Sequence, residues 1–213
     1  MSALSIGRGI GIAIAFACVS GAVGISPAFA YPVSRDTQAA MELLQKKDYR
    51  GALEAADKVL KAHPNDAVAR ATRGNAYIEL GDYEHALLDH DAVLAQVGDN
   101  PGALVNACWV RALANLDLDR ARIDCDKAVA KRHSLAGFDT RGFLDIRQGA
   151  FKAAIADYDE ALKVRPKTAS SLYGRGLAKI RVGDDTGGQA DMAAARQLQP
   201  DIAEVYLRRG LKP

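Results

Sequence analysis

The residues of this chain with the most evident chemistry are its cysteines. Cys108 and Cys125 lie 17 positions apart and are the only cysteines after residue 30. A catalytic cysteine needs a histidine partner that helps to form its thiolate. His133 is the only histidine near them in the sequence, which makes a nucleophilic cysteine a weak candidate. We therefore predict no catalytic residue.

His85, Asp89 and His90 are the candidate metal ligands. His85 and Asp89 are four residues apart, so on a helix they share a face and can approach one ion together. Asp89, however, belongs to a pattern of aspartates that recurs along the chain. We therefore predict no metal site and expect no cofactor.

The recurring aspartates form pairs whose members are two positions apart. The pairs are Asp89/Asp91, Asp124/Asp126 and Asp157/Asp159. Paired carboxylates can perform acid–base catalysis, but residues two positions apart on a helix point in different directions. Because arginines recur in register with the pairs, we expect Arg–Asp ion pairs between helices, for example at Arg141. Such pairs can determine how helices stack even where they add little net stability.

The composition of the 213-residue chain favours a folded, all-α protein. It is 49% hydrophobic and 25% charged, and the strong helix formers alanine, leucine and arginine recur throughout. Arg8 is the only charged residue before position 31. The rest of the chain therefore carries 27 of the 28 basic residues and all 26 acidic residues, so its charges are almost balanced. Nucleic-acid binders usually show a clustered basic face. This balance argues against a nucleic-acid partner.

Residues 1–30 have the pattern of a cleavable signal peptide. Arg8 precedes an apolar stretch over residues 10–19, and the segment ends in Ala28-Phe29-Ala30, the small-x-small pattern of a cleavage site. A retained membrane anchor and a lipoprotein cleavage before Cys18 are the alternatives. The expected destination is the periplasm of a bacterium or its exterior. Contact with the membrane is then only transient, through the signal peptide.

The rest of the chain repeats with a period of 34 residues. An arginine–glycine pair recurs with separations of 68, 34 and 34 residues, at Arg73-Gly74, Arg141-Gly142, Arg175-Gly176 and Arg209-Gly210. Prolines mark the ends of three repeats, at Pro64, Pro166 and Pro200. Periods of this length are typical of repeat proteins built from stacked supersecondary units.

The offsets resemble those of the tetratricopeptide repeat. The clearest copy is Ala67–Asn100, with Gly74, Tyr77 and Ala86 at the expected positions. The resemblance implies an all-α, right-handed superhelical solenoid of about five helical hairpins. It divides the chain after the signal peptide into an array over 31–213, with approximate repeats 33–66, 67–100, 101–134, 135–168 and 169–202 and a cap at 203–213.

Two units depart from the pattern. In the third, the turn over residues 115–119 holds one extra residue. In the fifth, Gly187-Gly188 at the start of the second helix lowers the helix propensity of that hairpin. After Pro200, the residues from Asp201 to Glu204 have the pattern of a capping box. We expect them to open a last helix that covers the exposed core of the fifth hairpin.

The repeat places Cys108 and Cys125 on the two helices of one hairpin, at positions that face each other. Two cysteines in an oxidising compartment favour a disulfide, and two buried packing thiols are the alternative. The same repeat assigns His90 to a core position that relatives fill with an aromatic residue. This position is a further argument against a metal site.

The family resemblance implies a non-enzymatic scaffold that holds a protein or peptide in its concave groove. The first helix of each hairpin lines that groove in the family. The matching positions here are Asn75, Glu79, Trp109, Phe143, Arg147, Tyr173 and Arg181. Trp109, Phe143 and Tyr173 are the expected apolar anchors, flanked by two arginine donors. The alternative is that these aromatics pack on neighbouring helices.

Two other functions remain open at this point. One is an accessory or carbohydrate-handling role in cell-wall or envelope metabolism, for which Asp139 beside Phe143 is the only suitable pair of residues. The other is a self-assembling structural protein that associates through its open N-terminal hairpin.

Export gives a direct test. We expect the mature protein to begin at Tyr31, because signal peptidase should cut after Ala30. N-terminal sequencing of protein purified from its native cells measures this. A chain that retains Met1 and is found in the cytosol would contradict export.

Overall fold

A computed structural model describes residues 33–212, and this described part contains eleven helices and no strand. The predicted signal peptide, including Cys18, lies outside the described residues. The helices form five antiparallel pairs followed by one short helix. They are α1 (Arg35–Gln45) with α2 (Tyr49–Ala62), α3 (Ala67–Leu80) with α4 (Tyr83–Val97), α5 (Pro101–Ala114) with α6 (Leu118–Lys131), α7 (Leu135–Arg147) with α8 (Phe151–Val164), α9 (Ala169–Arg181) with α10 (Asp185–Leu198), and finally α11 (Ile202–Arg208).

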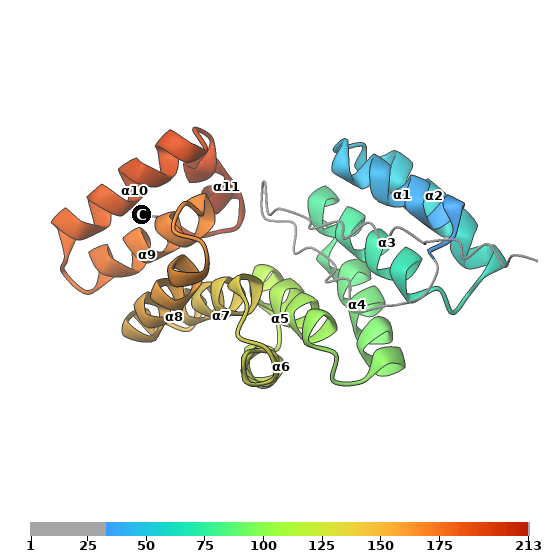
Figure 1. Cartoon of the computed structure of the whole chain (residues 1–213), viewed down its shortest axis with the longest axis horizontal. Coiled ribbons are helices and arrows are strands. Elements are labelled where there is room, and N and C mark those ends of the chain that lie inside the picture. The colour runs from blue at the N-terminus through green and yellow to red at the C-terminus, as the bar shows by residue number, and fades with distance from the viewer. Residues whose placement is uncertain (1–32, 213) are drawn as a thin grey trace, which may run out of the picture.

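The five hairpins follow one another along an arc (Figure 1). Among the first helices, α1 contacts α3, α5 contacts α7, and α7 contacts α9, whereas α4 contacts both α3 and α5. Helices α6 and α8 lie on the outer side of the arc, and α11 lies on its inner side near α9. The all-α solenoid expected from the repeat is therefore what the chain forms. No helix of residues 33–212 has the length and apolarity needed to cross a bilayer.

Glycine and aspartate residues at the turns separate the two helices of a hairpin. Gly81 ends α3 with a φ of 82°, and the side chain of Asp82 accepts the backbone N–H of His85 at the start of α4. The residue that precedes the second helix is Asp48, Asp82, Ala150 and Asp184 in the other hairpins, which fits the 34-residue period, but in the third hairpin it is Asp117, one position late. The insertion expected from the sequence is thus present.

A small residue on the first helix packs against a large one on the second. A Cβ atom at Gly142 would lie 3.0 Å from the ring of Tyr158. In the fifth hairpin, a Cβ at Gly176 would lie 2.7 Å from the carbonyl oxygen of Gly188. The weak helix propensity at Gly188 therefore accompanies a packing role, because any side chain there would force α9 and α10 apart.

One arginine links each hairpin to the one before it. Arg141 donates two hydrogen bonds to Asp157 of its own hairpin, at 2.7 and 2.8 Å, and one to Asp126 of the preceding hairpin, at 3.0 Å. Arg73 and Arg175 repeat this geometry with donor–acceptor distances of 2.6–2.8 Å. The hydrogen bonds to Asp157 and Asp126 raise the pKa of Arg141, so its guanidinium stays charged. The expected Arg–Asp pairs are confirmed, and each arginine bridges two hairpins.

The third hairpin makes the same link from a shifted position. Ala107 stands where the arginine is expected, and Arg111, one helical turn later, takes its place. Its guanidinium binds Asp124 of its own hairpin at 3.2 Å and Asp91 of the preceding hairpin at 2.7 Å. The link is therefore preserved in the least regular unit.

Helix α11 begins without the capping box that the sequence suggested. The Asp201 side chain makes no capping hydrogen bond and instead accepts one from the Gln199 side chain at 3.0 Å. The helix contacts α9 and α10, as a cap does, but its buried face also reaches α5 and α7. Its role is thus wider than covering the end of the fifth hairpin.

His90 is a buried polar residue whose two ring nitrogens have no hydrogen-bond partner among the described residues. Burial lowers the pKa of His90 to about 4, and the nearby charge of Asp89 only partly opposes this effect. The folded state therefore resists protonation of this ring, whereas the unfolded chain takes up the proton near pH 6.5. The contribution of the neutral His90 ring to the free energy of unfolding is therefore fully present above pH 6.5 and is lost as the pH falls towards 4.

We expect His90→Phe to remove this pH dependence, because phenylalanine fills the same space and has no proton to bind. Relative to wild type, its free energy of unfolding should rise by roughly 2 to 3 kcal/mol between pH 7.5 and pH 4.5. Urea unfolding at the two pH values measures the difference. The matched control is His63→Gln at an exposed histidine, which should follow wild type at both. If the free energy of unfolding changed with pH equally in His90→Phe and in the control, the buried His90 ring would not be the source of the pH dependence.

Candidate partner-binding groove

The seven groove residues expected from the sequence all lie on first helices of hairpins. Asn75 and Glu79 are on α3, Trp109 is on α5, Phe143 and Arg147 are on α7, and Tyr173 and Arg181 are on α9. These helices follow the inner side of the arc in Figure 1. Whether a partner binds there depends on which of these side chains remain accessible.

The aromatic side chains of the groove are buried. Trp109 is 5% exposed, and Phe143 and Tyr173 are each 1% exposed. The expectation of an open aromatic wall is therefore wrong. Its physical reason is the C-terminal segment, residues 202–212, which lies against these rings and shares one apolar cluster with them through Ile202, Val205 and Leu211.

Tyr206 and Arg209 make the closest contacts between the C-terminal segment and the wall. The ring centroid of Tyr206 lies 4.8 Å from that of Tyr173 and 6.2 Å from that of Phe143. Its hydroxyl donates a hydrogen bond to the carbonyl oxygen of Ser170 at 2.8 Å. The guanidinium carbon of Arg209 lies 4.9 Å from the ring centroid of Trp109, a cation–π contact.

The two arginines expected to flank a bound peptide also bind the C-terminal segment. Arg147 donates hydrogen bonds to the carbonyl oxygens of Arg209 and, at 3.3 Å, of Leu113. Arg181 donates one to the carbonyl oxygen of Lys212 at 3.2 Å. A cation at the end of a helix is favourable because the last carbonyl groups carry partial negative charge. Both arginines therefore hold the backbone at and beyond the end of α11.

A pocket of about 360 Å³ remains open beside α11. Its walls come from α3, the following turn, α4, α5 and α11. The lining residues are Ile78, Glu79, Leu80, Gly81, Tyr83, Trp109, Leu113, Val205, Arg208 and Arg209. Asn75 does not line it and is 8% exposed. Of the seven expected residues, Glu79 and Trp109 are those that line this pocket.

The pocket carries charges of both signs at its rim. Glu79 lies on the α3 side, whereas Arg208 and Arg209 lie on the α11 side. Surrounding protein raises the pKa of the Glu79 carboxyl, and the charge of Arg209 opposes that effect. The Glu79 side chain is nevertheless exposed, so solvent screens part of this effect. An occupant with an apolar group and both charge signs fits these walls.

The pair proposed for carbohydrate binding is not available. Phe143 is covered by Tyr206, and the Asp139 carboxylate accepts hydrogen bonds from the hydroxyls of Ser171, at 2.5 Å, and Ser170, at 3.3 Å. Burial raises the pKa of Asp139, and the Ser171 hydrogen bond opposes the shift. The residues joined here hold α7 to α9 and do not face a sugar-sized opening.

The residues considered as metal ligands are also separated. Asp89 is bound by Arg73, with donor–acceptor distances of 2.7 and 2.8 Å, and His90 points into the core. His85 instead pairs with Asp82 on the surface. Within residues 33–212 no three histidine, cysteine, aspartate or glutamate side chains are placed to share an ion.

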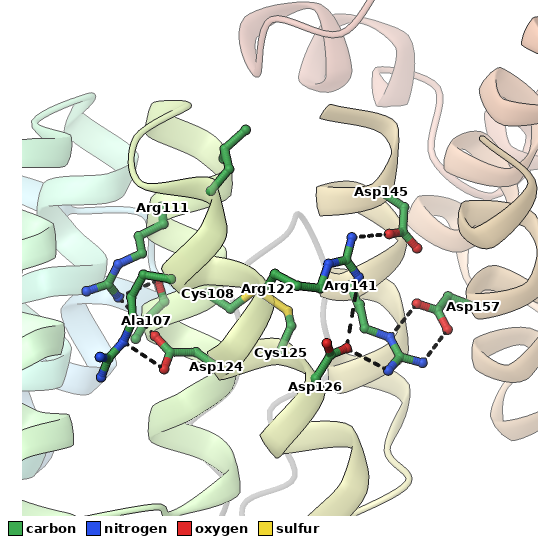
Figure 2. The surroundings of a disulfide bond; sticks show 12 residues. Ala107, Cys108, Arg111, Arg122, Asp124, Cys125, Asp126, Arg141, Asp145 and Asp157 are labelled. Atoms are coloured by element: carbon green, nitrogen blue, oxygen red, sulfur yellow. Dashed lines mark hydrogen bonds and ion pairs between the residues drawn. A yellow bond between two sulfur atoms is a disulfide. The ribbon is translucent and has the colours of Figure 1, made fainter. Parts of the chain in front are cut away.

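A disulfide joins Cys108 of α5 to Cys125 of α6, with a Cα–Cα distance of 5.6 Å (Figure 2). The two cysteines take the positions that Gly142 and Tyr158 hold in the fourth hairpin. A covalent bond thus replaces the packing of a small residue against a large one. The bond lies next to Trp109 in the sequence and fixes the helix that carries it.

The C-terminal contacts were missed by sequence reasoning. Tyr206 and Arg209 were assigned to an end cap, although they bind the inner wall. One signal was present in the sequence. Ala193 stands where the earlier hairpins carry Asp57, Asp91 and Asp159, so Arg209 has no aspartate of the preceding hairpin to bind.

Comparison with known proteins agrees with the helical-hairpin architecture. A family model described as a TPR repeat matches residues 144–183, and one described as a tetratricopeptide repeat matches residues 43–101. Among solved structures, the type IV pilus biogenesis factor PilW has a TM-score of 0.69 at 20% identity, covering 81% of this chain and 85% of that chain. The similarity to structures at this level of identity concerns the fold.

Two further solved structures resemble the chain. A thermophilic TPR protein of Thermus thermophilus, TTC0263, has a TM-score of 0.68 at 18% identity and covers 82% of this chain and 95% of that chain. MamA from Desulfovibrio magneticus RS-1, residues 41 to the end, has a TM-score of 0.61 at 16% identity and covers 80% and 98%.

The disulfide should be present in the protein as it occurs in the cell. We expect Cys108 and Cys125 to resist alkylation until reductant is added, as measured by intact mass. Closing a loop of 17 residues stabilises the fold by about 3 kcal/mol in the chain-entropy model. Reductant should therefore lower the free energy of unfolding of wild type but not of the control Cys108→Ala/Cys125→Ala. Two free thiols in protein taken from its native compartment would contradict the bond.

Proposed function

Because this chain belongs to the tetratricopeptide-repeat family, we propose that it is a non-catalytic scaffold that holds a protein or peptide partner against its inner surface. The observation that carries the proposal is the open pocket lined by residues of α3, α5 and α11. Tyr83, Trp109 and Leu113 give it apolar walls, and aromatic residues are enriched where partners bind.

The charges at the rim limit the class of partner. Glu79 attracts a cationic side chain, whereas Arg208 and Arg209 attract a carboxylate on the opposite side. A peptide segment with one apolar anchor between residues of opposite charge can pair with Glu79, Arg208 and Arg209 at the same time. Large patches of a single charge are not part of this site, which agrees with the nearly balanced charge of the chain.

The non-catalytic part of the proposal is supported by the use of the reactive groups. Cys108 and Cys125 are bonded to each other, and His90 is enclosed in the core. The Asp139 carboxylate is bound by two serine hydroxyls. Each of these groups has a structural partner or a structural position instead of an approach to a substrate.

We also propose that the scaffold acts outside the cytoplasm, in the periplasm or beyond it. The pattern of residues 1–30 supports export. A disulfide between Cys108 and Cys125 is of the kind that persists in oxidising compartments. The partner is then itself an exported or envelope protein.

Partner capture tests the pocket with two matched leucine variants. Leu80 lines the pocket and is 42% exposed, whereas Leu88 lies on α4 outside it and is 64% exposed. We expect Leu80→Asp to lower capture of the partner from an envelope extract by about tenfold, the effect of losing one apolar anchor. Leu88→Asp should capture as wild type does. Quantitative mass spectrometry of the bound fraction measures both.

Two results of this experiment would contradict the proposal. Equal capture by wild type and Leu80→Asp would exclude the pocket as the binding surface. Failure of wild type to capture any protein above the level of beads alone would exclude the scaffold function itself.

A further inference from the structure

The C-terminal segment occupies the inner wall in the way that a bound peptide would. Besides Leu211, its buried residues are Ile202, Val205, Tyr206 and, half-buried, Arg209, which fall at positions i, i+3, i+4 and i+7 of one helix face. This spacing is the pattern by which an amphipathic helix enters a groove. The opposite face is solvent-exposed, with Leu207 at 53%.

The wall contacts this segment through both its side chains and its backbone. Tyr206 packs against two aromatic rings, and Arg209 covers Trp109. Arg147 and Arg181 bind main-chain carbonyl oxygens near the end of the segment. Contacts to carbonyl oxygens do not depend on the side chains of the bound helix, so another helix of similar shape can satisfy the same two arginines.

Helix α11 is held weakly by its own sequence. It has seven residues, fewer than an isolated helix needs to be stable in water, and no side chain caps its first turn. Its arginine lacks the aspartate link that fastens α5, α7 and α9 to the hairpin before each of them, because position 193 is alanine. The docked state of α11 therefore depends on its contacts with the wall and with α10, without an arginine–aspartate link to the preceding hairpin.

We propose that the inner wall of Trp109, Phe143 and Tyr173 is a docking site for a short amphipathic helix of a protein partner, and that α11 occupies this site until the partner replaces it. The proposal rests on the proposed scaffold function and adds the chemistry of the ligand. That ligand carries two aliphatic residues, a tyrosine and an arginine at the spacing of Ile202, Val205, Tyr206 and Arg209.

The pocket beside α11 favours a partner helix over the α11 of a second copy. The wall continues past the pocket to Ile78 and Tyr83, which α11 leaves uncovered. A partner helix with larger apolar side chains on the flank that faces the pocket gains this additional apolar surface, whereas a second copy of α11 gains none. The additional buried apolar surface gives the partner helix the higher affinity that it needs to replace α11.

Trp109 provides the readout, because it is the only tryptophan of the chain and lies under Arg209. The probe is a synthetic peptide of residues 201–212, added to the full chain. In the variant Tyr206→Ala, we expect the Trp109 emission to shift to longer wavelength as α11 leaves, and to return saturably when the peptide is added. A peptide with alanine at both Tyr206 and Arg209 should not restore it.

The matched control is Leu207→Ala, a change on the exposed face of the same helix. Wild type and this control should bind the peptide at least about tenfold more weakly than Tyr206→Ala, because the tethered segment competes with the added one. Equal affinities of all three proteins would overturn competition between α11 and an added helix.

Hydrogen exchange of the wild-type chain gives a second measurement that does not depend on the folding of a variant. The amides of Val205 and Arg209, bonded within α11, should exchange faster than those of α9. Excess peptide should raise their exchange further. Protection equal to that of α9, unchanged by the peptide, would overturn the proposal. So would a concentration-dependent dimer in which α11 becomes more protected, because a second copy would then be the occupant.

These outcomes are distinguishable from failure of the scaffold function. If partner capture depends on Leu80 but the peptide never competes with α11, the partner uses the pocket and α11 is a fixed wall. If the peptide exchanges with α11 but no partner is captured, the docking site exists and the scaffold function is wrong.

Discussion

The array depends on one repeated interaction, an arginine that binds an aspartate of its own hairpin and an aspartate of the hairpin before it. In Arg73, Arg141 and Arg175 the planar guanidinium holds the aspartate of its own hairpin with two hydrogen bonds, and one further bond reaches the preceding hairpin. Apolar packing alone gives stacked hairpins a broad choice of rotation. The net stability of such half-buried pairs is modest, and their larger effect here is on geometry.

The end of this series explains the position of α11. Four arginines find two carboxylates each, but Arg209 follows a hairpin whose second helix carries Ala193, and no further helix follows it within residues 33–212. Without the link, nothing directs the last helix along the array. Its arginine turns to the ring of Trp109, and its apolar face turns to the aromatic residues of α7 and α9. A change from aspartate to alanine on α10 is thus associated with a change in the surface that the whole groove presents.

The hairpins and their links could be predicted from the sequence because each depends on residues at a fixed period. The extra residue before Asp117 and the pairing of Arg141 with Asp126 and Asp157 are of this kind. The burial of Phe143 could not be predicted in this way, because Tyr206, the residue that covers it, lies 63 positions later. The position of α11 results from contacts between distant residues, and the one related signal in the repeat, Ala193, indicates that the usual link is missing but not where the helix lies. For Gly188, the sequence indicates only a low helix propensity. Its close approach to Gly176 becomes visible only when the two helices are packed together.

The disulfide at the centre of the array has a consequence for the chain under tension. A solenoid whose units contact only their neighbours unravels from its ends when it is pulled. The bond between Cys108 and Cys125 closes a loop of 17 residues inside the third of five hairpins. Those residues cannot lengthen, which removes about 60 Å from the extension that the stretched chain can reach. The segment between Cys108 and Cys125 therefore stays short, whereas the hairpins on both sides of it can unfold and extend. A force applied at one end of the array is carried past this segment by the disulfide bond.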